Sequence, residues 1–364
     1  MKKFKRIASM YPVETNGSIE YTVVLARKNE ERHIIDCVNT AFNNSDIEEI
    51  LKSTAVDLFV GVMPSQGYFS RTIKLPPVEP ERTPELMRFE AAQQIPFDIE
   101  DVAWGWKMLT DYPNDMNLEI KIAATKKEII ERYFPFKQMG FITSTAEAIP
   151  SLYQNPKDER LEAIIAIGDK CTDLIISKNG VSTWNRSMPV GDAEINKLKE
   201  EPANGTSITA YEAAIDDLVG EINRTLGFYF SINPGSKIEC LISPNKDEEL
   251  IDELNKRLKL PENRENLIIQ YRNPYEKFEG EPDYQSIEEV FAAAGVLGCD
   301  NAINLSSKKK SDFSKIYRYP VGAGLVALSY PFSIPGKILN GIGDYLNDAG
   351  DKVLGIERKE YPHI

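Results

Sequence analysis

The alternation of hydrophobic and polar residues predicts two similar groups of three strands, each followed by helical sequence. In the clearer group Ala163–Ile167 is a short apolar run typical of a buried strand, and Asp173–Lys178 and Val181–Met188 continue the extended pattern. Asn179-Gly180 is a dipeptide favoured in tight hairpin turns. We therefore expect a meander of three strands here, with a polar turn at Gly168–Lys170.

The N-terminal part of the chain repeats this order. A turn-rich stretch, Pro12–Ser18, separates two apolar runs, and a helix is expected at Asn43–Ser53. A repeated order of strands and helices predicts two similar α/β lobes with a cleft between them. The strands expected in the first lobe are Phe4–Tyr11, Tyr21–Arg27, His33–Phe42, Val56–Met63 and Phe69–Leu75.

Between these groups the pattern predicts an inserted α+β subdomain. Thr83–Ile95 is an expected helix with Leu86, Phe89 and Ala92 on one face, followed by strands at 102–109 and 118–125. The expected fold class is α/β. The predicted division is 1–80 for the first part of lobe 1, 81–147 for the inserted subdomain, 148–305 for lobe 2 and 306–364 for a C-terminal arm.

The C-terminal arm differs in composition from the rest. Lys308–Arg318 holds five basic residues against one acidic residue, and Tyr319–Ile342 is almost uncharged but interrupted by prolines. A membrane-spanning helix needs roughly 20 uninterrupted apolar residues, so none is expected here. Two interpretations stay open. The arm packs on the body or on a neighbouring subunit, or residues 308–342 lie on an anionic membrane surface.

Composition excludes several functions. The formal net charge of -13 disfavours binding to a nucleic-acid backbone. Only two histidines, His33 and His363, are present, which leaves little material for Ser-His-Asp or Cys-His catalysis. The four cysteines are widely spaced, so a zinc cluster is not expected. We predict no metal site.

Two stretches carry candidate binding chemistry. The amides of a tight turn between strands can surround a phosphate, which makes the turn at Gly168–Lys170 a candidate for such a site. Trp104 and Trp106 alternate and so share one face of their expected strand. That face either packs on the neighbouring helix or anchors a partner peptide, since tryptophan is enriched at binding hot spots.

The stretch Arg88–Trp106, RFEAAQQIPFDIEDVAWGW, resembles the PilM family of type IV pilus assembly proteins, whose inserted subdomain has an E-A-x-x-x-I-P-F signature. The resemblance implies an actin-like fold with a duplicated ribonuclease-H-like core, related to the cell-division actin homologues and the type II secretion L component. It also implies ATP binding between the lobes. It implies a position on the cytoplasmic face of the inner membrane, holding the N-terminal cytoplasmic peptide of PilN. This peptide is expected against the inserted subdomain and first lobe, with Phe97, Trp104 and Trp106 as candidate partner-binding residues.

An actin-like ATPase needs an Asp-x-Gly in each phosphate hairpin and a glycine-rich adenosine loop. This chain has Ala166-Ile167-Gly168 at the second hairpin, no Asp-x-Gly within Pro12–Ser18, and Ser243-Pro244-Asn245 at the adenosine loop. We therefore predict a pseudo-ATPase without catalytic residues or a cofactor. The vestigial phosphate loop would comprise Gly168, Asp169, Lys170 and Thr172.

The predicted function is a cytoplasmic scaffold, peripheral to the inner membrane, in a type IV pilus or related secretion platform. Its expected partners are a PilN-like peptide and other platform proteins, with self-association as an open alternative. One rival is an active actin-like ATPase that binds Mg·ATP through noncanonical residues such as Glu14 or Asp169. The other rival is a filament-forming structural protein.

Overall fold

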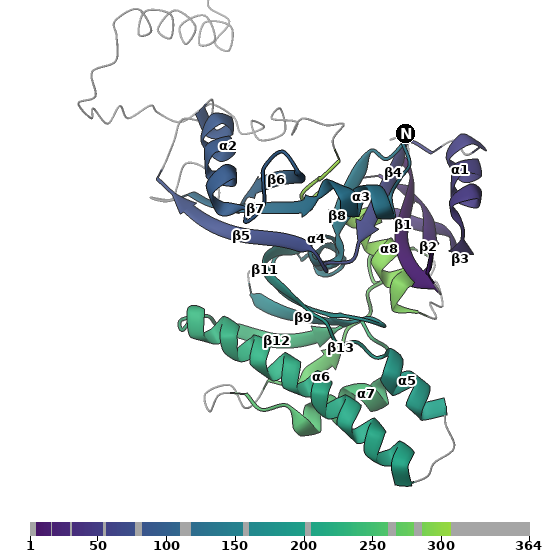
Figure 1. Ribbon diagram of the computed structural model, residues 1–364, viewed down its shortest axis with the longest axis vertical. Coiled ribbons are helices and arrows are strands. Elements are labelled where there is room, and N and C mark those ends of the chain that lie inside the picture. Colours follow the sequence, from purple (N-terminus) through teal and green to yellow (C-terminus); the bar gives the residue numbers. More distant parts are fainter. Residues whose placement is uncertain are drawn as a thin grey trace, which may run out of the picture. The chain divides into compact units, whose positions relative to one another are not determined.

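The structure is a computed structural model that describes residues 5–15, 17–29, 31–53, 56–76, 82–109, 118–155, 160–200, 205–260, 267–279 and 286–306. Apart from Ser306, the predicted C-terminal arm and its proposed membrane segment, 308–342, lie outside the described residues. Three β-sheets organise the described part of the chain (Figure 1). None of its helices is long and apolar enough to span a membrane.

The first sheet has the strand order β3-β2-β1-β4-β8. Strands β1 to β3 form an antiparallel meander, and β4 and β8 extend it in parallel from β1. The turn between β1 and β2 is shorter than the predicted Pro12–Ser18, because cross-strand pairing continues to Thr15 and Ser18. The elements are β1 (Lys5–Thr15), β2 (Ser18–Lys28), β3 (His33–Phe42), α1 (Asn44–Ser53), β4 (Leu58–Met63) and β8 (Phe141–Ser144).

The second sheet repeats this plan in the order β11-β10-β9-β12-β13. Here β9 to β11 form the antiparallel meander, and β12 and β13 add in parallel. The two sheets therefore have the same order and strand directions, which confirms the predicted duplication. The elements are β9 (Leu161–Ile167), β10 (Thr172–Lys178), β11 (Val181–Met188), α5 (Ala193–Glu200), α6 (Gly205–Ile232), β12 (Ile238–Ser243), α7 (Glu248–Arg257) and β13 (Ile269–Tyr271).

The inserted subdomain is a three-stranded antiparallel sheet, β5-β7-β6, covered by α2. The pairing differs from the predicted limits of 81–147 at both ends. β5 pairs along its whole length with β7, so it belongs to the insert, and β8 pairs with β4 of the first sheet. The elements are β5 (Tyr68–Leu75), α2 (Thr83–Gln94), β6 (Val102–Met108), β7 (Leu118–Lys126) and α3 (Lys127–Tyr133).

Helix α2 does not bury the predicted face. Met87 and Ala91 are fully buried against the sheet, whereas Phe89 is 61% exposed and Ala92 is also exposed. Met87 and Ala91 lie one helical turn apart and share a face, so the helix is rotated from the orientation that the larger side chains suggested. Phe89 is thus left on the surface of the insert.

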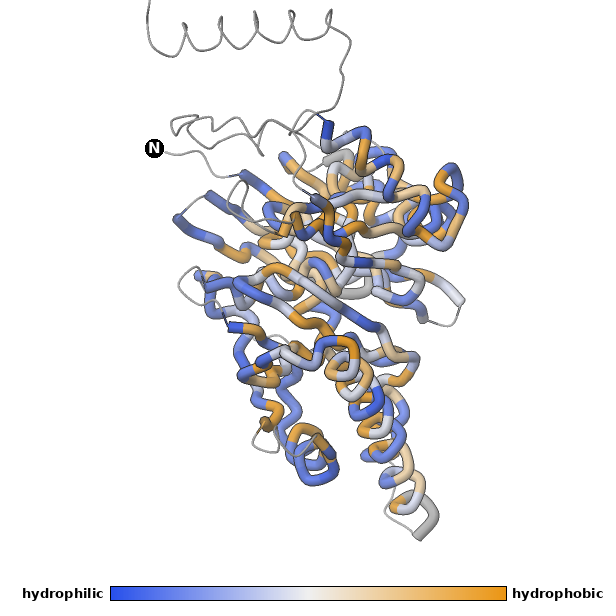
Figure 2. Tube along the Cα trace, turned by 90° about the vertical axis from the view of Figure 1, so that its left-hand side faces the viewer, coloured by the Kyte–Doolittle hydropathy of each residue, from blue (hydrophilic) through white to orange (hydrophobic). Residues whose placement is uncertain are grey.

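A central helix connects the two lobes. Residues Glu289–Gly298 of α8 (Ile287–Gly298) are all buried. One hydrophobic cluster joins Val60 of the first sheet, Ile164 of the second and Phe291 of α8. The link between the lobes runs through α4 (Thr145–Ala148) and the 3-10 helix η2 (Ile149–Tyr153). Central strands of both sheets are buried, as Val60, Ile164 and Ile242 show, and Figure 2 gives the hydropathy of each residue along the chain.

Candidate functional site

The turns of the two meanders meet where the lobes adjoin. The β1–β2 turn follows Thr15, and the β9–β10 turn spans residues 168–171 between Ile167 and Thr172. Lys170 reaches across from the second turn: its Nζ lies 3.3 Å from the carbonyl oxygen of Glu14 and 3.6 Å from Glu14 Oε2. We call this pair, Glu14 and Lys170, the hairpin junction. It joins the turn at the end of β1 to the turn between β9 and β10.

Glu14 also has two partners on α3 of the insert. Arg132 donates to Glu14 Oε1 at 2.7 Å, and the hydroxyl of Tyr133 donates to the same oxygen at 3.0 Å. Burial, together with this hydrogen bond, raises the pKa of Tyr133 to about 12. The carboxylate of Glu14 thus has three donors, Lys170, Arg132 and Tyr133.

The second turn is fastened to the start of α5. The backbone amide of Gly168 donates to Cys171, and the carbonyls of Gly168 and Asp169 accept from the amides of Asp192 and Ala193, each at 3.1 Å. This close approach requires a glycine at 191, since a Cβ there would lie 2.1 Å from the Gly168 oxygen. The turn therefore has a fixed position relative to the second sheet.

The predicted hydroxyl at Thr172 is used inside the protein. Thr172 is fully buried, and its Oγ1 donates to the carbonyl of Val190 at 2.8 Å. The next residue, Asp173, is a buried carboxylate that sequence reasoning did not select. Its Oδ2 accepts from Thr145 Oγ1 of α4 at 2.5 Å, and burial raises its pKa. Asp173 thus links the second sheet to the segment that joins the lobes.

Three further carboxylates influence one another beside the turn. Burial and the nearby charge of Asp169 raise the pKa of Asp192 to about 6. The same two causes, in the same order, raise the pKa of Glu288 at the start of α8. These three residues thus place negative charge beside the turn. Among the described residues, no group of three His, Cys, Asp or Glu is arranged to hold a metal ion.

The loop after β12, at which the resemblance led us to expect an adenosine loop, is bonded to β9 by the side chain of Asn245. Asn245 is 7% exposed, and its side-chain amide forms two hydrogen bonds with the backbone of Ile167. Its Oδ1 accepts from the Ile167 amide at 2.9 Å, and its Nδ2 donates to the Ile167 carbonyl at 2.7 Å. The hydroxyl of Ser243 donates to the carbonyl of Ile165 at 2.8 Å. These bonds pin β9 at the end that carries the turn.

The aromatic residues predicted to bind a partner lie on the insert. Trp104 and Trp106 are half-buried and pack, on one face of β6, against the hydrophobic cluster beneath α2. Phe97 follows α2, is 37% exposed, and has Lys126 Nζ 5.9 Å from its ring centre. The structure thus places both tryptophans in helix packing and leaves more of Phe97 on the surface.

A second polar contact between the lobes is buried. The Nζ of Lys121 on β7 forms an ion pair with Glu147 of α4 and donates to Ser182 Oγ of β11 at 2.7 Å. Lys121 is 1% exposed and Glu147 is 3% exposed. We call these three residues the buried junction. No local sequence pattern predicts the buried junction, because its three residues come from the insert, the link and the second sheet.

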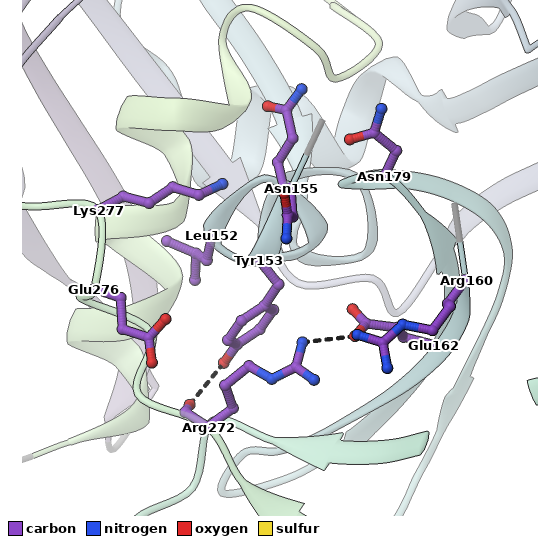
Figure 3. A pocket seen from close by; sticks show the side chains of 10 residues that line it. Leu152, Tyr153, Asn155, Arg160, Glu162, Asn179, Arg272, Glu276 and Lys277 are labelled. Atoms are coloured by element: carbon purple, nitrogen blue, oxygen red, sulfur yellow. Dashed lines mark hydrogen bonds and ion pairs between the residues drawn. The ribbon is translucent and has the colours of Figure 1, made fainter. Parts of the chain in front are cut away.

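A polar pocket of about 360 Å³ lies at the other end of β9 from the turn (Figure 3). Arg272 crosses it and pairs with Glu162 at 2.7 Å, and the Tyr153 hydroxyl donates to the Arg272 carbonyl at 3.2 Å. Burial lowers the pKa of Lys277 in its wall to about 8. Glu162 neutralises the charge of Arg272. The charges that line the pocket therefore do not indicate a particular class of ligand.

Comparison with known proteins gives a fold but no close relative. No model of a known protein family matches the sequence, and no curated protein matches it. Among solved structures, the cytoplasmic domain of EpsL, an inner-membrane component of the Vibrio cholerae type II secretion system, covers 83% of this chain and 98% of its own length at 9% identity, with a TM-score of 0.41. A Bacteroides thetaiotaomicron protein with an actin-like ATPase fold and unknown function covers 81% and 96% at 10% identity, with a TM-score of 0.41.

A stronger match is the PilM-PilN type IV pilus biogenesis complex. It aligns over 80% of this chain and 96% of that chain with a TM-score of 0.60, at 15% sequence identity. The match covers nearly the whole solved chain, and the duplicated sheets described above agree with it. This protein therefore has the actin-like α/β fold of PilM, as the motif at Arg88–Trp106 predicted.

Proposed function

We propose that this chain is a PilM-like scaffold of a type IV pilus or related secretion platform, acting at the cytoplasmic face of the inner membrane. The single observation that carries the proposal is the fold shared with PilM over 96% of that chain. Its partner would be a short cytoplasmic peptide of a bitopic, PilN-like membrane protein. The peptide would bind against the insert and the first lobe.

We further propose that the chain does not hydrolyse ATP. Three local features support this. Glu14 and Lys170 are paired with each other, Thr172 donates to a backbone carbonyl, and Asn245 closes the adenosine-loop position. A bound triphosphate would have to displace these bonds next to the carboxylates of Asp192 and Glu288.

Calorimetric titration with Mg·ATP, run beside a hydrolysis assay on the full chain, tests the second proposal. We expect neither binding in the micromolar range nor turnover. Turnover that is lost in Asp169→Ala but kept in Lys178→Ala, a matched surface variant remote from the turn, would establish the rival actin-like ATPase instead.

Pulldown of the full chain on an immobilised peptide of the membrane partner tests the scaffold. Retention is expected, and Phe97→Ala should weaken it more than Trp104→Ala, because Phe97 exposes more of its ring. Phe228→Ala, which removes an exposed aromatic from α6 of the second lobe, is the matched control. Absence of retention would contradict the proposed partner. A liposome flotation assay with and without residues 308–364 tests membrane contact separately.

A further inference from the structure

The last described residues pack against the edge strand of the first sheet. Beyond α8, Leu305 donates its amide to the carbonyl of Ile142 at 2.7 Å. Ile142 belongs to β8, the edge strand of that sheet. The side chain of Asn304 adds two bonds, accepting from the Ile142 amide at 3.1 Å and donating to the Gly140 carbonyl at 3.4 Å. We call residues Ile303–Ser306 the strap.

The other wall of the strap's groove is β6 of the insert. A Cβ on Gly105 would lie 2.6 Å from Ile303 Cγ2 and 3.2 Å from the Asn304 carbonyl oxygen. This closeness shows that the strap lies directly on β6 at that point. It lies on the face opposite Trp104 and Trp106, since side chains alternate along a strand. The groove therefore runs between the insert and the first sheet.

The strap is held as a bound peptide would be. Ile303 and Leu305 are 4% and 2% exposed within a hydrophobic cluster of the first lobe, and Asn304 between them reads the backbone of residues 140 and 142. Addition of an extended segment to a sheet edge is a common mode of peptide recognition: backbone bonds give affinity and alternate side chains give specificity. The side chains recognised in the strap are an apolar residue, an amide and a second apolar residue, namely Ile303, Asn304 and Leu305.

We propose that this groove is a peptide-binding site whose resident ligand is the chain's own strap, and that the partner's peptide must displace the strap to bind. The groove lies between the insert and the first lobe, where the proposed function places that peptide. The identity of the competitor therefore rests on the proposed function. The peptide site and its occupation in cis rest only on the contacts of the strap.

Competition in cis sets the apparent affinity. A peptide added in trans binds only the fraction of molecules whose groove is open, so its apparent dissociation constant rises as that fraction falls. A change that weakens the strap must therefore strengthen binding of an unchanged peptide. This inverse relation separates a competing strap from a segment that is merely structural.

Fluorescence anisotropy with a labelled peptide of sequence DNAINLSSK, copying residues 300–308, provides the test on the full chain. Asn304→Ala in the protein removes two bonds of the strap, and we expect the probe to bind about tenfold more tightly than to the unmodified chain. Gly105→Val places a side chain in the groove and should abolish binding. A probe with alanine in place of the asparagine that copies Asn304 should bind at least tenfold more weakly.

Circular dichroism of each variant confirms folding. The proposal is overturned if the probe binds neither the unmodified chain nor Asn304→Ala, or if Gly105→Val, shown to be folded, binds it normally. The partner's cytoplasmic peptide is tested in the same assay. Binding of the probe without binding of the partner's peptide contradicts the proposed function alone. Binding of the partner's peptide that neither variant alters contradicts the competing strap alone.

Discussion

The hairpin junction and the buried junction both join the lobes through a lysine and a glutamate, but they differ in exposure. The side chain of Lys170 is 65% exposed and that of Glu14 is 31% exposed, whereas Lys121 and Glu147 are almost completely buried. Water screens the first pair, which makes it worth little, while the second must stay intact because neither charge can reach water. The lobes are therefore fixed at the insert and only lightly linked at the turns.

The largest effect is expected at the buried junction. Lys121→Ala leaves the Glu147 carboxylate buried without its cation, which should lower the free energy of unfolding by about 3–5 kcal/mol in urea denaturation. Lys121→Met combined with Glu147→Met is the control. Removing both charges should restore most of the loss, because a buried pair contributes little against apolar replacements. Equal losses in Lys121→Ala and in the double variant would contradict the proposed difference between the buried and the exposed pair.

A smaller loss of free energy of unfolding is expected on substitution of Asn245. This residue fixes the turn after β9, and its hydrogen bonds described above lie within the second lobe rather than between the lobes. Asn245→Ala leaves the buried amide and carbonyl of Ile167 without partners, costing about 2–3 kcal/mol. Hydrogen exchange at the Ile167 amide should accelerate. Asn255→Ala is a matched control, since Asn255 binds the backbone of Ile269 in the same way at the sheet's other edge. Acceleration at Ile167 in that control would contradict the assignment.

The carboxylates beside the turn give a pH-dependent effect. The pKa of Asp192 is raised from 3.8 to about 6. Between these two pH values the folded state keeps a proton on Asp192 that the unfolded state has released. Stability from this group is therefore present below pH 4 and lost as pH rises to about 6. Asp192→Asn removes this loss and should gain about 1–2 kcal/mol relative to the unmodified chain between pH 4 and 7. A constant difference over that range would contradict the shift.

The smallest effect is expected at the hairpin junction. Lys170→Ala should change the free energy of unfolding by less than about 1 kcal/mol, because Glu14 keeps Arg132 and Tyr133 as partners. Urea denaturation at low and high salt measures this, and added salt should reduce the difference further. A loss comparable to that of Lys121→Ala would show that both junctions hold the lobes together.

Local sequence patterns predicted much of the fold. The apolar runs predicted at 163–167 and 56–63 correspond to β9 and β4. Asn179-Gly180 forms the expected turn, with φ angles of 49° and 71°. These elements depend on near neighbours, so their signal is local. The rotation of α2 was missed because Phe89 is large and apolar yet exposed, which only the packing of Met87 and Ala91 reveals.

The site was harder to predict because its residues meet only in three dimensions. Gly168 and Lys170 were found from the turn, but the partners of Lys170 and Thr172 could not be, since Glu14 and Val190 lie on other elements. Asp173 and Lys121 looked like ordinary polar positions in strands. Their burial depends on α4 and β11, which no local pattern places. The strap likewise follows the last helix without any strand signal of its own.

The buried junction also limits how the insert can be exchanged between proteins. Lys121 lies on the insert's central strand, while Glu147 and Ser182 lie on the link and the second lobe. An insert grafted onto another actin-like scaffold would bring a lysine without its carboxylate. Such a chimera would have to carry Glu147 and Ser182 along, or replace Lys121 with an apolar residue. The insert is therefore not a transferable module, although it has its own sheet and helix.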